Sequence, residues 1–119
     1  MNNMKLAIIG SRNFHDYELL KSKCDYFLGR SFDNEIVIIS GGAKGADQLA
    51  ERYARENNME LQVFKADWDA HGRSAGMKRN LVVQRECTHV IAFWDGKSPG
   101  TNHMIQTIGK EKPIRVINF

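Results

Sequence analysis

The sequence is poor in the features that define several large classes of protein. Its 119 residues include two prolines and two cysteines, and Cys24 and Cys87 stand in unrelated contexts. We therefore expect reduced thiols in a cytoplasmic protein and no disulfide framework. No apolar run approaches the roughly 20 residues of a membrane span, and the N-terminus lacks a signal-peptide layout, so no membrane partner is predicted. Without repeats or low-complexity segments, residues 1–119 are expected to form one domain.

Metal-ligand patterns and strong charge are also absent. The four histidines share no metal-ligand spacing with the cysteines, so neither a metal site nor a cofactor is predicted. The net charge of +3 does not by itself imply nucleic acid. The basic residues do gather in or beside a few loops: Arg12, Lys44, Arg73, Lys78, Arg79 and Lys97. A cationic rim of this kind suits an anionic small molecule, and a nucleic-acid backbone remains an alternative.

The stretch from Ile36 to Asp47 organises the rest of the chain. Four consecutive β-branched apolar residues predict a strand that is buried on both faces of a parallel sheet. Three glycines follow, and a helical pattern then begins. A helix N-terminus presents unpaired backbone N–H groups and the positive end of the helix dipole, so this turn is predicted to hold a phosphate. The candidate residues are Gly41, Gly42, Lys44, Gly45, Ala46 and Asp47. The turn matches neither the dinucleotide fingerprint nor the P-loop, so a plain connection is the alternative.

Apolar runs and helical patterns alternate along the whole chain. Strands are predicted at residues 5–10, 36–40, 61–64, 88–94 and 114–117. Helices are predicted from an Asp16 cap to Gly29, from 46 to 58, from just after Gly76, and from a Thr101 cap to Gly109, with loops at 31–35 and 66–76. This order indicates an α/β fold: a Rossmann-like, doubly wound, mostly parallel five-stranded sheet with helices on both faces.

The loops that follow the first four predicted strands share a composition. Each one is polar and contains glycine: 10–12, 41–47, 66–76 and 95–101. Ligands of open α/β sheets bind at the carboxyl ends of the strands, where these loops meet. The gathering of polar, glycine-bearing loops at one edge of the sheet favours a ligand site over a plain connection. Gly10, Ser11 and Arg12 are placed near the phosphate or sugar on the same ground.

Four motifs in chain order resemble one known family. They are Gly10 to Phe14, Gly41 to Asp47, Gly72 to Asn80, and Phe93 to Thr101. Together they resemble the SLOG superfamily, in particular its small YspA-like branch, from about residue 5 to 116. The resemblance implies a Rossmann-like fold and a nucleotide or nucleotide-derived ligand, such as a nucleoside monophosphate or an ADP-ribose-like molecule. It also implies a binding or sensing role.

The related LOG-type phosphoribohydrolases suggest roles for single residues. Their phosphate loop resembles Ser98-Pro-Gly-Thr101, which implies phosphate binding by Ser98, Gly100 and Thr101. Their catalytic arginine resembles Arg79, beside Asn80. The glutamate of those enzymes falls here on Met104, so a carboxylate expected to assist glycosidic cleavage is missing. LOG-type relatives pair as dimers, so a homodimer through the helix of Met77, Leu81 and Gln84 is an expectation.

Several side chains admit two readings. Asp47 is either a helix-terminal residue or a partner of ribose hydroxyls and, with Arg79, a catalytic residue. Trp68 is a candidate for stacking on a base, whereas Trp94 ends a core strand. Arg73 and Arg79 could clamp a phosphate with two hydrogen bonds. The leading prediction is a nucleotide-binding or sensing domain; the alternatives are a nucleotide-processing hydrolase and a nucleic-acid-binding module.

Overall fold

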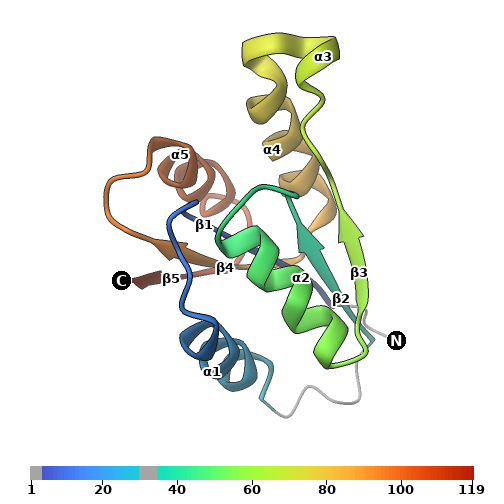
Figure 1. The fold of residues 1–119 in the computed structure, drawn as a ribbon, viewed down its shortest axis with the longest axis vertical. Helices are drawn as coiled ribbons and strands as arrows, with labels where there is room; N and C mark the ends of the chain where they lie inside the picture. The colour runs from blue at the N-terminus through green and yellow to red at the C-terminus, as the bar shows by residue number, and fades with distance from the viewer. Residues whose placement is uncertain (1–3, 30–34) are drawn as a thin grey trace.

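A five-stranded parallel sheet forms the centre of the computed structural model, which describes residues 4–29 and 35–119. The strands are β1 (Met4–Gly10), β2 (Ile36–Ser40), β3 (Glu60–Val63), β4 (His89–Trp94) and β5 (Ile114–Asn118). Their order is β3-β2-β1-β4-β5, and every neighbouring pair is parallel (Figure 1). The predicted Rossmann-like fold is confirmed, with a sheet that is wholly parallel. The loop predicted at 31–35 lies, apart from Glu35, outside the described residues.

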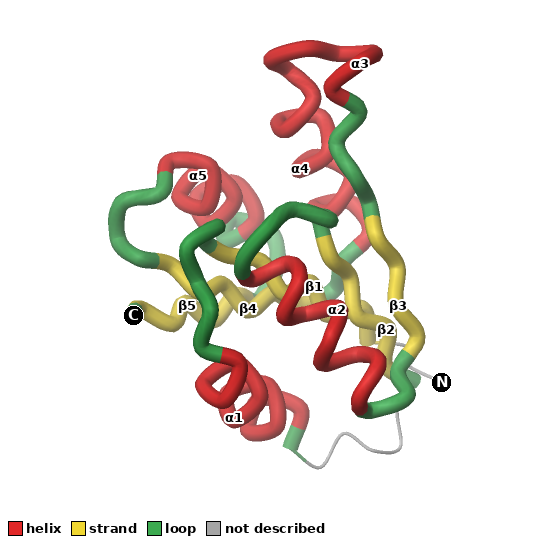
Figure 2. Tube along the Cα trace, viewed as in Figure 1, coloured by secondary structure: helices red, strands yellow, loops and turns green. Residues whose placement is uncertain are grey.

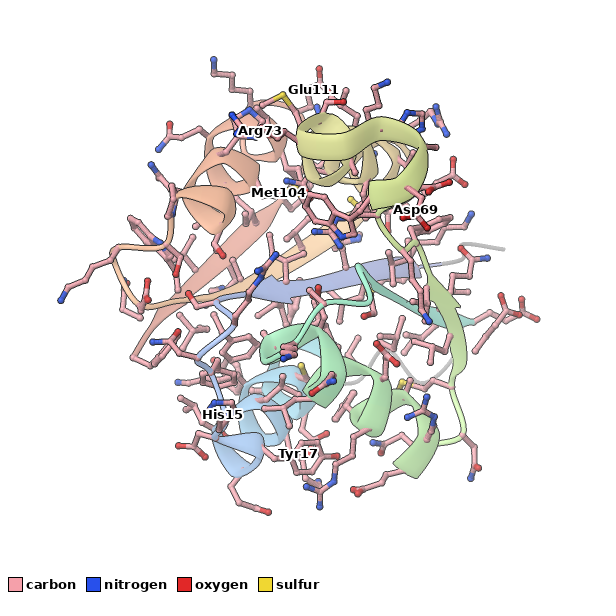
Figure 3. The ribbon with its side chains drawn as sticks, turned by 45° about the horizontal axis from the view of Figure 1, so that its top comes forward. His15, Tyr17, Asp69, Arg73, Met104 and Glu111 are labelled. Atoms are coloured by element: carbon pink, nitrogen blue, oxygen red, sulfur yellow. The ribbon has the colours of Figure 1, made fainter. Side chains whose placement is uncertain are left out.

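Helices cover both faces of the sheet. Helices α1 (Tyr17–Leu28) and α2 (Ala46–Glu56) lie on one face; α4 (Ala75–Glu86) and α5 (Pro99–Ile108) lie on the other. Successive side chains of a strand point to opposite faces, so Leu6 and Ile8 join the core beneath α1 and α2. Ala7 and Ile9 join the core beneath α4 and α5. Figure 3 shows the two sides, with Tyr17 on the first and Met104 on the second.

Helix α1 begins and ends where the sequence predicts. The Asp16 carboxylate accepts a hydrogen bond from the Leu19 amide at 3.0 Å, as an N-cap does. Gly29 follows the last turn with φ of 49°, and its N–H donates to the Asp25 carbonyl. These local signals were sufficient because the partners lie within four residues of each other.

Two predicted boundaries are wrong. Residues 66–76 are not a loop: they contain the short helix α3 (Trp68–His71) and a 3-10 turn (Gly72–Ser74), and α4 already begins at Ala75. The missed signal is Asp67, whose carboxylate caps α3 by accepting from the Ala70 amide. Thr101 is not an N-cap either. Helix α5 begins at Pro99 with Ser98 as its N-cap, because proline at the first helical position has a suitable φ and no N–H to satisfy.

The strand order defines one special place in the sheet. The chain runs outward from β1 to β3 on one side and then returns to β4 on the other, so the direction of winding reverses between β1 and β4. Figure 2 shows the loops after β1 and β2 side by side above this point. Helix α3 and the start of α4 extend beyond the strand ends (Figure 1). Among the described residues, no helix combines the length and apolarity that a membrane crossing requires.

Candidate functional site

A cavity of about 470 Å³ opens at the carboxyl ends of β1, β2 and β4. We call it the switch-point cavity. The structure brings ten of the predicted site residues to its wall: Gly10, Ser11, Arg12, Gly41, Asp47, Arg79, Asn80, Ser98, Gly100 and Thr101. They come from the end of β1, the loops after β1, β2 and β4, and the helices α2, α4 and α5. The cavity lies where the winding of the sheet reverses, which is the usual ligand position in folds of this type.

The first turn of α5 reaches the cavity without a side-chain cap. The Ser98 side chain makes no hydrogen bond to the helix amides, because its hydroxyl donates to Asp95 Oδ2 at 2.9 Å. Gly100 and Thr101 line the cavity, and a Cβ built on Gly100 would have no other atom within 4 Å. The N-terminal amides of this helix therefore face an open space that an anion could occupy.

Asp95 holds the loop before α5 in place. Its Oδ1 accepts hydrogen bonds from the amides of Lys97 at 2.9 Å and Ser98 at 2.8 Å. These amide bonds lower the pKa of Asp95 to about 2. The Asp95 amide donates to the Ser11 hydroxyl oxygen at 3.2 Å, so the loops after β1 and β4 are joined. Asp95 is a turn residue, as expected, and it also contributes to the cavity wall.

The glycine turn after β2 faces the same cavity, but several of its amides are already occupied. The Gly42 amide donates to Ser40 Oγ, and the Ala43 amide donates to Asp47 Oδ2, both at 3.1 Å. The Ala46 amide donates to the Ser11 carbonyl at 3.3 Å. These three donors serve the protein itself. The N-terminus of α5 is thus the stronger candidate for holding an anion through its backbone.

Asp47 and Arg79 meet beside Gly41. Arg79 Nη1 donates to the Gly41 carbonyl, and a Cβ at residue 41 would lie 2.5 Å from Nη1 and 2.9 Å from Asp47 Oδ2. Only glycine permits this close approach. Arg79 Nε donates to Asn80 Oδ1 at 2.8 Å. Two of its five N–H groups are therefore used, and the others have no partner among the described residues.

Burial favours the uncharged form of both groups and shifts their pKa values accordingly. Asp47 is only 6% exposed, and desolvation raises its pKa above the ordinary value, against the opposing effects of the Ala43 amide and the Arg79 charge. Desolvation also lowers the pKa of Arg79; the Asp47 charge opposes this shift, and the weaker effect of the Arg12 charge adds to it. An anionic ligand between Arg12 and Arg79 would relieve this repulsion.

The remaining predicted residues lie elsewhere. Gly42, Lys44 and Trp68 line a neighbouring groove. Gly45 and Ala46 are buried behind the loop after β1. Arg73 is exposed in the 3-10 turn after α3 and lines neither space (Figure 3). The structure thus separates Arg73 from Arg79, because α3 carries Arg73 beyond the strand ends.

Sequence reasoning missed several residues of the two spaces. Asn13, Ala43 and Pro99 also line the switch-point cavity, together with apolar Met104. Lys65, Gln48 and Ala66 line the neighbouring groove. Lys65 had a usable signal, because it comes two residues after β3 at the same edge of the sheet. Gln48 had none, since it looks like any exposed helix residue.

The chain belongs to the YspA, cpYpsA-related SLOG family, whose profile matches residues 4–71. It is also 36% identical to the Gene 61 protein of Mycobacterium phage D29, over 97% of this chain and 95% of the phage protein. The matched region contains β1, the glycine turn after β2, and β3. The family expected from the four motifs is confirmed.

Solved structures share the fold at low sequence identity. The protein TM1055 superposes with a TM-score of 0.65 at 21% identity, over 93% of this chain and 72% of its own length. DNA processing protein A from Helicobacter pylori, described with a single-stranded DNA binding mode, gives a TM-score of 0.60 at 24% identity. The Streptococcus pneumoniae protein of the same name gives 0.56 at 19%. This chain spans 64% and 58% of those two proteins.

Proposed function

We propose that this protein binds the phosphate group of a nucleotide or nucleotide-derived ligand in the switch-point cavity, as a binding or sensing domain. The observation that carries the proposal is the uncapped first turn of α5, which opens into the same cavity as Arg12 and Arg79. Backbone N–H groups and the helix dipole favour an anion at this point, and guanidinium groups bind phosphate with two parallel hydrogen bonds.

The shape and chemistry of the cavity suit such a ligand. Its volume falls within the roughly 300–1,000 Å³ typical of small-molecule sites. One wall is polar, and Ile9, Val83 and Met104 supply an apolar wall on which a sugar or base could rest. Both carboxylates at the wall are engaged: Asp95 with its own loop, and Asp47 with the Ala43 amide. Asp47 offsets part of the Arg79 charge, and the attraction for an anion comes from the Arg12 and Arg79 guanidinium groups together with the first turn of α5.

A thermal-shift screen tests the proposal. Nucleoside monophosphates, ADP-ribose and NAD are tested beside inorganic phosphate and unphosphorylated nucleosides. A ligand at about 100 times its Kd stabilises the folded state by about 2.7 kcal/mol, so at least one phosphorylated compound should raise the Tm clearly. The matching nucleoside should have a much smaller effect. No shift with any phosphorylated compound at millimolar concentration would contradict the proposal.

A hydrolase that cleaves the N-glycosidic bond of a nucleotide is the second candidate. The observation that favours it is Asp47, a buried carboxyl with a raised pKa at the cavity wall, which could protonate a departing base. The apolar side chain of Met104 lines the cavity where LOG-type enzymes have glutamate, which argues against it. Chromatography of a bound nucleotide for released base distinguishes the two. If base is released, Asp47→Asn should abolish the release while nucleotide binding persists.

A further inference from the structure

A second space adjoins the switch-point cavity. This groove, of about 510 Å³, lies between the glycine turn after β2 and the segment that leads from β3 into α3. We call it the Trp68 groove. It shares Arg12, Gly41, Ala43 and Arg79 with the switch-point cavity, so the two spaces adjoin at these residues. A ligand long enough to pass Arg79 would contact both spaces.

The charged side chains that line the Trp68 groove are all cationic. Arg12, Lys44, Lys65 and Arg79 line it, and no aspartate or glutamate does. None of these four cations takes part in any of the ion pairs within residues 4–29 and 35–119. Cations concentrated in a concave surface attract an anionic group. The groove therefore has the charge for a phosphate of its own.

An aromatic ring stands at the same groove. Trp68 is 52% exposed although tryptophan is among the side chains that gain most from burial. Its position is fixed by the backbone, since it is the first residue of α3, whose cap Asp67 bonds the Ala70 amide at 3.0 Å. The edge of the ring rests over Gly76, where a Cβ would lie 3.4 Å from Cη2. A supported, exposed indole beside cations is suited to stacking on a nucleobase.

We infer that the Trp68 groove is a second subsite, which takes a second nucleoside joined through phosphate to the nucleotide held in the switch-point cavity. The base stacks on Trp68, and Lys44 and Lys65 contact the linking phosphate. This inference rests on the proposed function, because it requires a first phosphate at α5. Two sources share the required chemistry: a free dinucleotide with a pyrophosphate link, and the end of a single strand of nucleic acid with a phosphodiester link.

Calorimetric titration at one fixed ionic strength tests the inference with three probes. These are AMP, diadenosine pyrophosphate and 5′-phosphorylated adenylyl-adenosine. At least one two-base probe should bind the wild type about tenfold more tightly than AMP, as expected for one stacked base. If only the pyrophosphate probe binds more tightly than AMP, the ligand is a free dinucleotide. If the phosphodiester probe binds more tightly than AMP, the ligand is a nucleic-acid strand.

Variants test which residues provide the additional affinity of the two-base probe. Trp68→Ala should remove most of the advantage of the two-base probe and leave AMP affinity unchanged. Tyr26→Ala, which removes an exposed aromatic side chain from α1, is the matched control and should change neither. The double variant Lys44→Gln/Lys65→Gln should also reduce the advantage. The double variant Lys23→Gln/Lys110→Gln removes the same charge from other exposed positions and should not.

The outcomes separate the two proposals. If AMP binds but neither two-base probe binds more tightly, the subsite is overturned and the proposed function stands. If no probe binds, the proposed function itself fails. If Trp68→Ala weakens AMP as much as the two-base probe, or if the two lysine double variants behave alike, the assignment of the second nucleoside to this groove is wrong.

Discussion

Two polar surfaces of the molecule use their charges in opposite ways. On the surface of α1 and α2, charged and phenolic groups satisfy one another: Lys21 with Asp25, Arg52 with Glu56, Tyr53 with Asp25, and Tyr17 with Glu56. Arg52 also lies over the Tyr17 ring, 3.8 Å from its centre. At the carboxyl edge of the sheet, Arg12, Lys44, Lys65 and Arg79 face the cavity and the Trp68 groove with no ion pair among the described residues.

The difference indicates which surface is built for a ligand. A self-paired network stabilises the fold modestly and leaves little for a partner to bind. Arg79 is attracted by Asp47 and repelled by Arg12, and burial also disfavours its charge, so a bound anion would stabilise the charged form. The comparison can therefore be tested by changing one residue at a time on each surface.

Arg79→Ala should have the largest effect on binding. The loss of a charge-assisted contact is expected to weaken nucleotide binding tenfold or more, about 1.4 kcal/mol, measured by titration calorimetry. Arg52→Ala is the control on the paired surface. It should lower the unfolding free energy only slightly, because the pair is exposed to solvent, and it should leave the affinity unchanged. Equal affinities for wild type and Arg79→Ala would remove Arg79 from the site.

Tyr53→Phe should affect stability alone. The Tyr53 hydroxyl donates to Asp25 Oδ1 at 2.7 Å, and the side chain is 1% exposed. Its loss should cost about 1 kcal/mol of unfolding free energy, measured by urea denaturation, because one hydrogen bond between protein groups disappears. Nucleotide affinity should stay as in the wild type. A weaker affinity would mean that the two surfaces are energetically coupled.

Gly100→Asp should change stability and binding in opposite directions. A carboxylate in the first turn of α5 interacts favourably with the helix dipole, worth about 0.3–1 kcal/mol, so the Tm should rise slightly. The same charge should repel a bound phosphate and weaken nucleotide binding several-fold. Gly100→Asn has nearly the same shape and should weaken binding much less. Equal binding by the two variants would argue against an anion at this helix end.

The smallest effect expected is on acid stability. The folded-state pKa of Asp95 is about 2, below its ordinary value of 3.8, so its hydrogen bonds favour the ionised form. Its contribution is complete above about pH 4 and is lost as the pH falls toward 2. The Tm difference between wild type and Asp95→Asn should therefore shrink between pH 5 and pH 2. A difference independent of pH would show that the charge of Asp95 does not stabilise the loop.

Much of the fold could be predicted because its signals are local. The β-branched run at 36–39 and the apolar run from Leu6 to Ile9 predict strands, and Asp16 and Gly29 bound α1. The two wrong boundaries also had local signals, the cap at Asp67 and the proline at residue 99. The polar composition of the surrounding residues favoured loops there instead. Ten of the predicted site residues line the cavity, because its wall follows the strand ends.

The sequence could not predict which backbone N–H groups are already bound within the protein. The Gly42 and Ala43 amides look available in the sequence, yet they are bound by Ser40 and Asp47. Gly42 adopts φ of 72°, and a Cβ there would lie 2.8 Å from Lys65 Cγ, so a larger residue at this position would strain the turn. Lys65 and Trp68 could not be assigned to one groove until α3 was placed beside the glycine turn.

By itself, the sequence determined the alternation of strands and helices, the edge of the sheet where the glycine-bearing loops gather, and the family. Those properties depend on neighbours a few residues apart. Only the tertiary structure decided that the Gly42, Ala43 and Ala46 amides are bound within the protein, and that Arg79 stands between two adjoining spaces. Hydrogen bonds between side chains and backbone of distant segments settle such questions, and their partners meet only when the chain is folded.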